Sequence, residues 1–86
     1  MEESKLISLA KQGDQQALEL LYRATVDSLY KFILYKVGHR ELSEDICQES
    51  YLRAFKNIGN FQGKSSFKTY VYTIAKNQII DHYKSK

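Results

Sequence analysis

The chain contains no proline, and its four glycines stand between segments that could each form a helix. Proline and glycine are the residues that most often end or kink a helix. Gly13 and Gly38 each follow a stretch whose apolar residues recur every three or four positions, the period of an amphipathic helix. The sequence therefore predicts an all-α fold. We expect a compact bundle of three main helices plus a short N-terminal helix, over residues 3–12, 14–37, 43–58 and 66–84.

The second predicted helix, residues 14–37, has the longest apolar stripe. Asp14 suits its N-cap, because a carboxylate accepts a hydrogen bond from a first-turn amide. Such a stripe is typical of a core-facing side, and here it consists of Leu18, Leu21, Tyr22, Val26, Leu29, Ile33 and Val37. Four more apolar residues near the end of the segment predict burial there on more than one side: Tyr30, Phe32, Leu34 and Tyr35.

The third predicted helix, residues 43–58, has two unlike sides, and Ser43 suits its N-cap. The inward side consists of Cys47, Ser50, Tyr51, Ala54, Phe55 and Ile58, and we interpret the cysteine as a small buried hydrophobe. The outward side consists of Asp45, Gln48, Glu49, Leu52, Arg53 and Lys56. Early acids and late bases suit the helix dipole, which alone could explain this order. A leucine at its centre leaves an interface as the alternative, although single exposed leucines are common.

The last third, residues 61–83, organises the rest of the chain. Ser65 and Ser66 suit a helix N-cap. The helix after them has an apolar side, of which Phe67, Val71, Ile74, Ala75 and Gln78 form the centre, and a polar strip of Thr69, Thr73, Lys76, Asn77 and Lys84, with Tyr70 at its border. The strip combines cations, amide, hydroxyls and a ring and has no carboxylate, which is typical of nucleic-acid contact.

The linker before this helix, residues 59–64, allows two interpretations. Its polar residues offer donors and acceptors to an unstacked base, and the following helix N-terminus attracts phosphate. Alternatively, the linker is a plain turn in which Phe61 tucks into the core.

Composition excludes several classes of protein. One cysteine cannot form an internal disulfide, and two histidines beside it are too few for a typical zinc site. No apolar run approaches the roughly 20 residues of a membrane span, and the N-terminus, MEESK, is unlike a secretion signal. No nucleotide-binding or catalytic signature is present. We expect a cytoplasmic protein that is not an enzyme, has no metal or cofactor and does not insert into a membrane.

The charge is divided unevenly along the chain. Residues 53–86 hold seven bases and one acid, a net charge of +6, whereas residues 1–52 hold six bases and nine acids, a net charge of −3. Such a division suggests two different partners. Chance segregation on a solvated surface is the alternative.

Four motifs in order resemble region 2 of bacterial RNA polymerase sigma factors, specifically the extracytoplasmic-function (ECF) group. They are DICQE, LRAF, FQGKSSFKTYVY and IAKNQIID, and the likeness extends over residues 13–84. The resemblance implies a helical bundle that docks on the clamp helices of the largest polymerase subunit. It also implies recognition and melting of the minus-ten promoter element, with capture of a flipped non-template base. An anti-sigma factor is a further partner that the resemblance implies.

The resemblance assigns roles to the surfaces described above. Polymerase binding falls to Asp45, Gln48, Glu49, Leu52, Arg53 and Lys56. DNA binding falls to Asn60, Phe61, Gln62, Gly63, Lys64, Ser65, Ser66, Lys68, Thr69, Tyr70, Thr73, Lys76, Asn77 and Lys84. The family often has tryptophan at Tyr70 and arginine at Thr73 and Lys76. Because these departures weaken the grip on phosphate, we expect the isolated domain to bind promoter DNA poorly.

Two other functions remain open on the residues alone. One is a protein-interaction module, an anti-sigma target or polymerase decoy, which would not need Lys76 and Asn77. The other is a general basic nucleic-acid binder, which would not need Asp45 or Gln48. Full-length members of the family continue into a second helical domain that reads the minus-thirty-five element, so we expect these 86 residues to be an excised fragment or a shortened natural protein.

Overall fold

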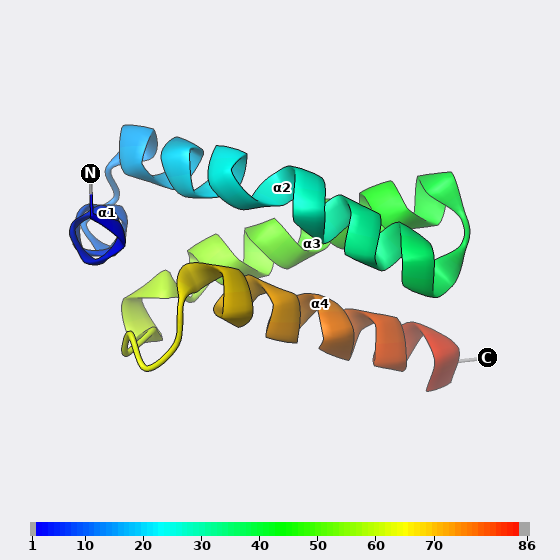
Figure 1. The fold of residues 1–86 in the computed structure, drawn as a ribbon. Helices are drawn as coiled ribbons and strands as arrows, with labels where there is room; N and C mark the ends of the chain where they lie inside the picture. Colours follow the sequence, from blue (N-terminus) through cyan, green and yellow to red (C-terminus); the bar gives the residue numbers. More distant parts are fainter. Residues whose placement is uncertain (1, 85–86) are drawn as a thin grey trace.

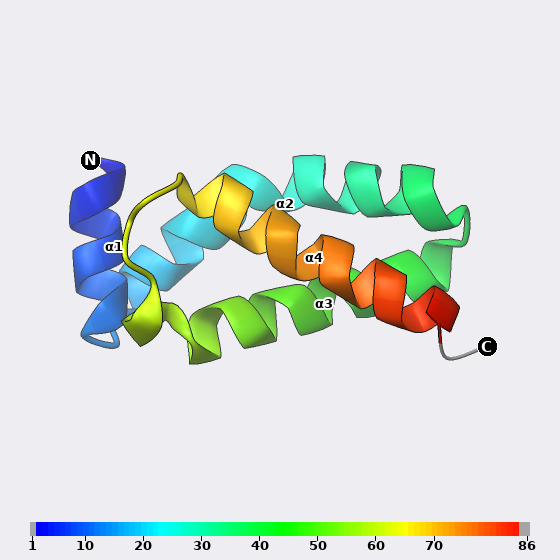
Figure 2. The same cartoon turned by 90° about the horizontal axis from the view of Figure 1, so that it is seen from below.

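The computed structural model describes residues 2–84, and its α-helices lie as three long rods and one short crosspiece (Figure 1). The elements are α1 (Glu3–Lys11), α2 (Gln15–Val37), α3 (Arg40–Lys56), the 3₁₀ helix η1 (Ile58–Asn60) and α4 (Phe67–Lys84). The long helices α2, α3 and α4 pack against one another, and α1 lies across one end of them (Figure 2). This arrangement confirms the predicted all-α bundle with a short N-terminal helix. None of the helices within residues 2–84 combines the length and apolar character of a membrane span.

The residues at the helix ends explain most of these boundaries. The Asp14 carboxylate accepts a hydrogen bond from the Ala17 amide at 3.0 Å, as its position predicted. The Ser66 hydroxyl accepts one from the Thr69 amide at 3.1 Å and so caps α4. Gly38 ends α2 at a φ of +67°, a left-handed conformation that glycine adopts without steric cost. Three of the four predicted helices therefore begin and end within one residue of their expected bounds.

The start of α3 differs from the prediction. The helix begins at Arg40 because the Nδ1 atom of His39 accepts the Leu42 amide at 3.2 Å and acts as the cap. Ser43 is instead fully buried inside the first turns, and its hydroxyl donates to the His39 carbonyl at 2.7 Å. The helix also ends at Lys56, so that Ile58 is buried from η1. Serine is a strong N-cap candidate only when its hydroxyl faces the free amides of the first turn.

A continuous run of ring contacts connects α2 to α4 through α3. Tyr22 packs edge-on against Tyr51 with ring centroids 4.8 Å apart, and Tyr51 continues to Phe55 at 5.8 Å. Phe55 then stacks on Phe67 of α4 at 5.9 Å. These contacts connect three helices through one layer of rings, and aromatic pairs of this kind stabilise beyond the area they bury.

The C-terminal end of α2 is less buried than its apolar residues predicted. Phe32 and Leu34 are partly buried, but Tyr35 is 85% exposed. Tyr22, in the middle of the predicted stripe, is 41% exposed. The Tyr22 ring is covered only in part, by Tyr51 of α3, whereas most of the Tyr35 ring lies in solvent.

Candidate functional site

The outward side of α3 forms a ridge of side chains that point away from the core. All six predicted polymerase-binding residues are exposed on it: Asp45, Gln48, Glu49, Leu52, Arg53 and Lys56. We call this set the α3 ridge. Leu52 is 60% exposed at its centre, and Arg53 donates to Glu49 at 3.0 Å across one helical turn. An apolar side chain framed by charged groups is the usual composition of a protein interface.

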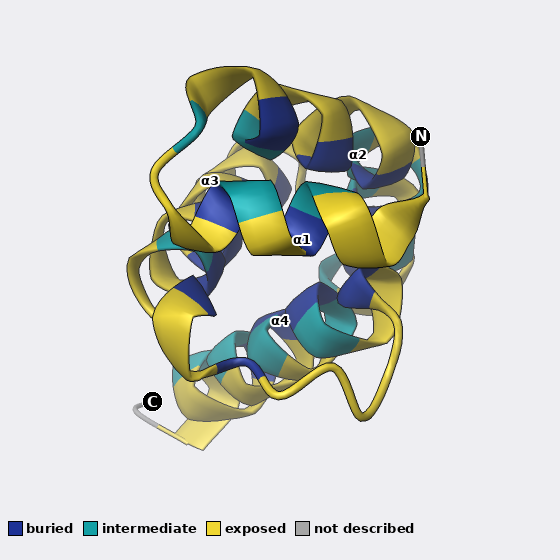
Figure 3. Cartoon of the chain, turned by 90° about the vertical axis from the view of Figure 1, so that its left-hand side faces the viewer, coloured by how far each residue is buried: buried dark blue, intermediate teal, exposed yellow. Residues whose placement is uncertain are grey.

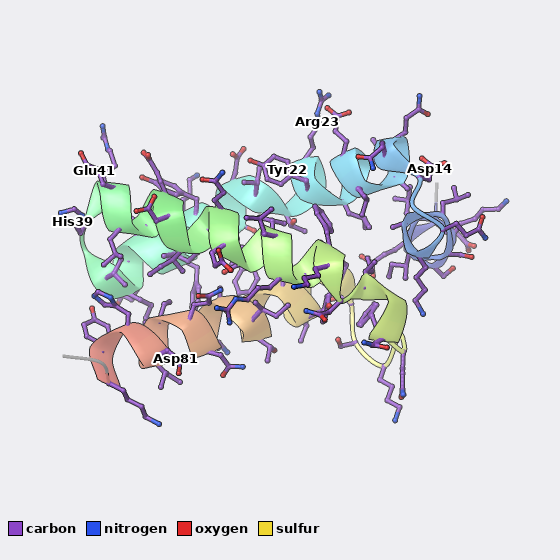
Figure 4. All side chains as sticks on the ribbon, turned by 180° about the vertical axis from the view of Figure 1, so that it is seen from behind. Asp14, Tyr22, Arg23, His39, Glu41 and Asp81 are labelled. Carbon is purple, nitrogen blue, oxygen red and sulfur yellow. The ribbon has the colours of Figure 1, made fainter. Side chains whose placement is uncertain are left out.

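Two grooves run along the sides of the α3 ridge. The α2–α3 groove, about 1050 Å³, has Gln48 and Leu52 on one wall and Tyr22 on the other. Figure 4 labels Tyr22 on α2, beside the face of α3 that is turned to the viewer. The α3–α4 groove, about 490 Å³, contains Asp45, Glu49 and Arg53. Five of the six predicted docking residues therefore divide between an aromatic groove and a charged one, and Lys56 lines neither of them.

The charged groove also contains residues that the sequence did not single out. Asp81 and His82 of α4 line it opposite Asp45. Gln78 lies at its base, and its Nε2 atom is the one buried side-chain nitrogen or oxygen without a hydrogen-bond partner in residues 2–84. The groove therefore has a negative rim and an unused amide donor. Because three of its lining residues belong to the last turns of α4, it exists only when α3 and α4 are packed together.

A third concave surface, which we call the loop pocket, lies between the linker and α4. It has a volume of about 440 Å³ and is shallow. Figure 3 shows the linker before α4 exposed along most of its length. The pocket lining combines amide, hydroxyl, ammonium and aromatic groups from Asn57, Asn60, Phe61, Gln62, Lys64, Ser65, Tyr70, Thr73 and Ile74. Seven of these nine are predicted DNA-binding residues, and the other two, Asn57 and Ile74, were missed.

The floor of the loop pocket consists of two stacked rings. Phe61 is only 8% exposed, and its ring lies on Tyr70 with centroids 4.6 Å apart and planes at 27°. The Tyr70 hydroxyl donates to the Ala54 carbonyl of α3 at 3.0 Å. Burial raises the pKa of the Tyr70 phenol, so the ring stays neutral. Phe61 thus tucks inwards, as the plain-turn interpretation held, while Asn60 and Gln62 beside it remain exposed.

The N-terminus of α4 borders this pocket and already has a carboxylate partner. Glu3 of α1 accepts the Phe67 amide at 3.1 Å, across 64 residues of sequence. The Ser66 hydroxyl accepts a hydrogen bond from the Thr69 amide and donates one to the Thr69 hydroxyl, each at 3.1 Å. The sequence predicted that this helix end would attract phosphate. Instead, the Phe67 amide donates to the Glu3 carboxylate of α1. A negative charge at this position is stabilised by the positive end of the α4 dipole.

The predicted polar strip runs along the outer side of α4. Lys68, Thr69, Thr73, Lys76, Asn77 and Lys84 are exposed, as are Gly63, Lys64, Ser65 and Ser66 before them. Tyr70 is partly buried at the border of the strip, and Ile80 lies exposed within it. The strip is therefore a continuous surface from the loop pocket to the last turn of α4.

The sequence also raised the questions of a reactive cysteine and of a metal site. Cys47 is buried, and burial raises the pKa of its thiol, which disfavours the nucleophilic thiolate. Among residues 2–84, no three histidine, cysteine, aspartate or glutamate side chains come close enough together to hold a metal ion.

The fold and the two surfaces define a helical module with one ridge of mixed charge around an exposed leucine and one pocket lined by a lysine and two stacked rings. The family model for sigma-70 region 2 matches residues 21–86, so the chain belongs to the sigma-70 region 2 family. Its relatives identify the extracytoplasmic-function group within that family.

Three relatives illustrate the likeness. The chain is 39% identical to the ECF RNA polymerase sigma factor BldN of Streptomyces coelicolor over 83 residues, which is 94% of this chain and 31% of BldN. It is 35% identical to the ECF RNA polymerase sigma factor SigW of Bacillus subtilis over 82 residues, 95% of this chain and 44% of SigW. It is 46% identical to a probable RNA polymerase sigma factor of Haemophilus influenzae over 55 residues, 64% of this chain and 28% of that protein. The chain thus spans less than half the length of each, and no solved structure matches it.

Proposed function

We propose that this chain directs transcription initiation: it docks on the RNA polymerase core through the α3 ridge and helps melt the minus-ten element by capturing a flipped non-template base in the loop pocket. The expected partners are the clamp helices of the largest polymerase subunit and the displaced promoter strand. The protein would act where the polymerase acts, in the cytoplasm, without catalytic chemistry of its own.

The observation that carries this proposal is the loop pocket. The stacked rings of Phe61 and Tyr70 line the pocket, together with the exposed donors and acceptors of Asn60, Gln62 and Lys64. A base that is unstacked from a duplex loses a few kcal/mol, and stacking on a ring returns roughly 1–3 kcal/mol. Since only the open duplex can occupy the pocket, this binding energy favours melting.

The α3 ridge supports the docking half of the proposal. Its exposed leucine is flanked by an aromatic groove on one side and by a charged groove on the other. A partner helix can bury Leu52 and still meet the carboxylates of Asp45 and Glu49. Fully buried apolar anchors with a polar rim carry most of the energy of such interfaces.

Recovery of core polymerase by the immobilised chain tests docking. We expect Asp45→Ala, Gln48→Ala and Glu49→Ala to lower recovery at least tenfold. Glu19→Ala is the matched control, because Glu19 is also exposed and also bonds an arginine four residues later, at 2.7 Å. Equal recovery by all four variants and the unmodified chain would remove the docking assignment.

Selection from single-stranded oligonucleotides with randomised positions tests base capture. We expect the chain, with core polymerase present, to enrich one short sequence, and Asn60→Ala to lower that enrichment. Enrichment of no sequence would favour the general basic nucleic-acid binder. Unchanged promoter opening by a Lys76→Ala, Asn77→Ala double variant, fused to the second domain of a full-length relative, would favour the interaction module.

A further inference from the structure

The boundary between α2 and α4 holds a cluster of lysines and rings. Its members Lys68 and Lys76 are predicted DNA-binding residues, whereas its α2 members have no role in the proposed function. Phe32 and Lys36 of α2 line a shallow groove of about 370 Å³ together with Lys76, Ile79 and Ile80 of α4. The sequence predicted burial for Phe32 and assigned no role to Lys36. The groove lies beside the polar strip and opens on the same side of α4 as Lys76.

An aromatic pair holds two of the lysines in place. Phe32 packs on Tyr72 of α4 with ring centroids 5.1 Å apart. The Lys36 ammonium lies 5.8 Å from the centre of the Phe32 ring and 6.0 Å from that of Tyr35. The Lys68 ammonium lies 5.6 Å from the centre of the Tyr72 ring. Attraction between a cation and a ring face keeps both ammonium groups at this boundary while they stay in contact with water.

We call this cluster the lysine seam: Phe32, Lys36, Lys68, Tyr72 and Lys76. A contact between the two helix ends supports it, because the Tyr83 hydroxyl donates to the Lys36 carbonyl at 3.4 Å. The position of Lys36 relative to α4 is therefore fixed by a backbone contact as well as by its side chain.

The charges around the lysine seam are all of one sign. No carboxylate lines the groove within the described part of the chain. The nearest acids on the same helices, Asp27 and Asp81, line the α2–α3 and α3–α4 grooves instead. Neither of the two ion pairs in residues 2–84 involves a seam lysine. Like charges gathered without a counter-charge repel one another and favour a bound polyanion.

The seam is continuous with the loop pocket along α4. Thr73 lines the pocket and Ile80 lines the groove. These residues are seven positions apart, which is nearly two helical turns and about 10 Å along the axis, so they lie on the same side of α4. At about 3.4 Å of helix axis for each nucleotide of a strand, this distance corresponds to about three nucleotides.

We propose that the lysine seam binds the phosphate backbone of the nucleic-acid strand that continues from the captured base, which extends the DNA contact from α4 onto Lys36 of α2. This inference rests on the proposed function, because the strand is the one whose base is captured in the loop pocket. Phosphate is favoured over an acidic protein because the cations follow one another along the helix that also borders the loop pocket. The seam would grip every sequence equally, since phosphate contacts position a strand and do not read it.

Binding of two fluorescent oligonucleotides to the 86-residue chain tests the proposal. The short probe has about four nucleotides of single strand, and the long probe extends it by about five nucleotides at each end. Lys36→Glu is the test variant. Lys31→Glu is the matched control, because Lys31 is exposed on the same helix but lines the α2–α3 groove, and the change in net charge is equal.

We expect Lys36→Glu to weaken binding of the long probe about fivefold at low salt, and to lower the slope of log K against log salt by about 0.7 to 0.9. The short probe should bind as before, and Lys31→Glu should leave both probes unaffected. Equal losses from the two variants, or equal losses on the two probes, would overturn the proposal. Displacement of the long probe by poly-glutamate as efficient as by DNA of equal charge would also overturn it, in favour of an acidic protein partner.

The same experiment separates the seam from the proposed base capture. If Asn60→Ala leaves both probes bound and Lys36→Glu still weakens the long one, base capture fails and the seam remains. If Asn60→Ala weakens both probes and Lys36→Glu changes neither, the seam fails and base capture remains. Thermal unfolding of each variant establishes that it is folded.

Discussion

The α3 ridge and the loop pocket are built in opposite ways. Every ridge residue comes from one helix and points into solvent, whereas the pocket combines η1, the linker and α4 around a stacked pair of rings, one buried and one partly buried. A ridge of this kind can change its side chains without changing the fold. The pocket cannot, because its floor belongs to the core. Function and stability are therefore separable on the first surface and coupled on the second.

The largest expected contrast comes from removing the apolar side chain at the centre of each surface. Phe61→Ala should lower the free energy of unfolding by about 3–5 kcal/mol, because a buried ring is lost and a cavity remains. Leu52→Ala should change it by less than about 0.5 kcal/mol, since Leu52 is 60% exposed. Urea unfolding followed by circular dichroism measures both. Equal losses would contradict the coupling described above.

Alkaline pH should destabilise the wall of the aromatic groove. Burial, partly offset by the hydrogen bond with Thr25, raises the pKa of Tyr51 to about 12 from the ordinary 10. Below pH 10 the Tyr51 phenol is protonated in both the folded and the unfolded state, and its contribution to the free energy of unfolding is fully present. Above pH 10 the unfolded chain loses the proton first, so about 3 kcal/mol of stability is lost as pH rises through 12. Urea unfolding at pH 9 to 12 should show this additional loss in the unmodified chain and not in Tyr51→Phe.

A smaller effect is expected at the floor of the loop pocket. Tyr70→Phe removes the hydrogen bond to the Ala54 carbonyl and keeps the ring, so the free energy of unfolding should fall by about 1 kcal/mol. Tyr35→Phe is the control, because that phenol is 85% exposed. Thermal unfolding of the two variants side by side is the measurement. A Tyr70→Phe protein as stable as the control would mean that water replaces the lost partner at no cost.

The smallest effect is expected on the α3 ridge. Breaking the ion pair between Glu49 and Arg53 with Glu49→Ala should cost at most about 0.5 kcal/mol, since both side chains are largely exposed. Glu19→Ala removes the equivalent pair on α2 and should cost the same. Comparison of their melting temperatures checks this. A larger loss for Glu49→Ala would show that ridge variants cannot report on docking alone.

The sequence predicted well whatever depends on one helix at a time. The caps at Asp14 and Ser66 and the outward set on α3 follow from helical period and local hydrogen bonding, and the structure confirms them. Ser43 was wrong as a cap because a ring nitrogen of His39 performs that role, and histidine is a rare cap. Local pattern cannot choose between two acceptors three or four residues apart.

Features made by two elements could not be predicted in this way. The seam between Phe32 and Tyr72, the bond from Glu3 to α4 and the exposure of Tyr35 all depend on how far neighbouring helices extend and where they cross. Periodicity assigns a side chain to a face but not to a neighbour. Asn57 and Ile74 were missed in the loop pocket for the same reason, since one follows α3 and the other belongs to the apolar side of α4.

The attachment of Tyr70 at both ends has a consequence for recognition. Its hydroxyl is tied to α3 and its ring rests on Phe61, so the orientation of the ring is set during folding. Ordering a mobile side chain at an interface costs about 0.5–1.5 kcal/mol. In the proposed base capture, the ring of Tyr70 would therefore be ordered during folding and not on binding of the strand.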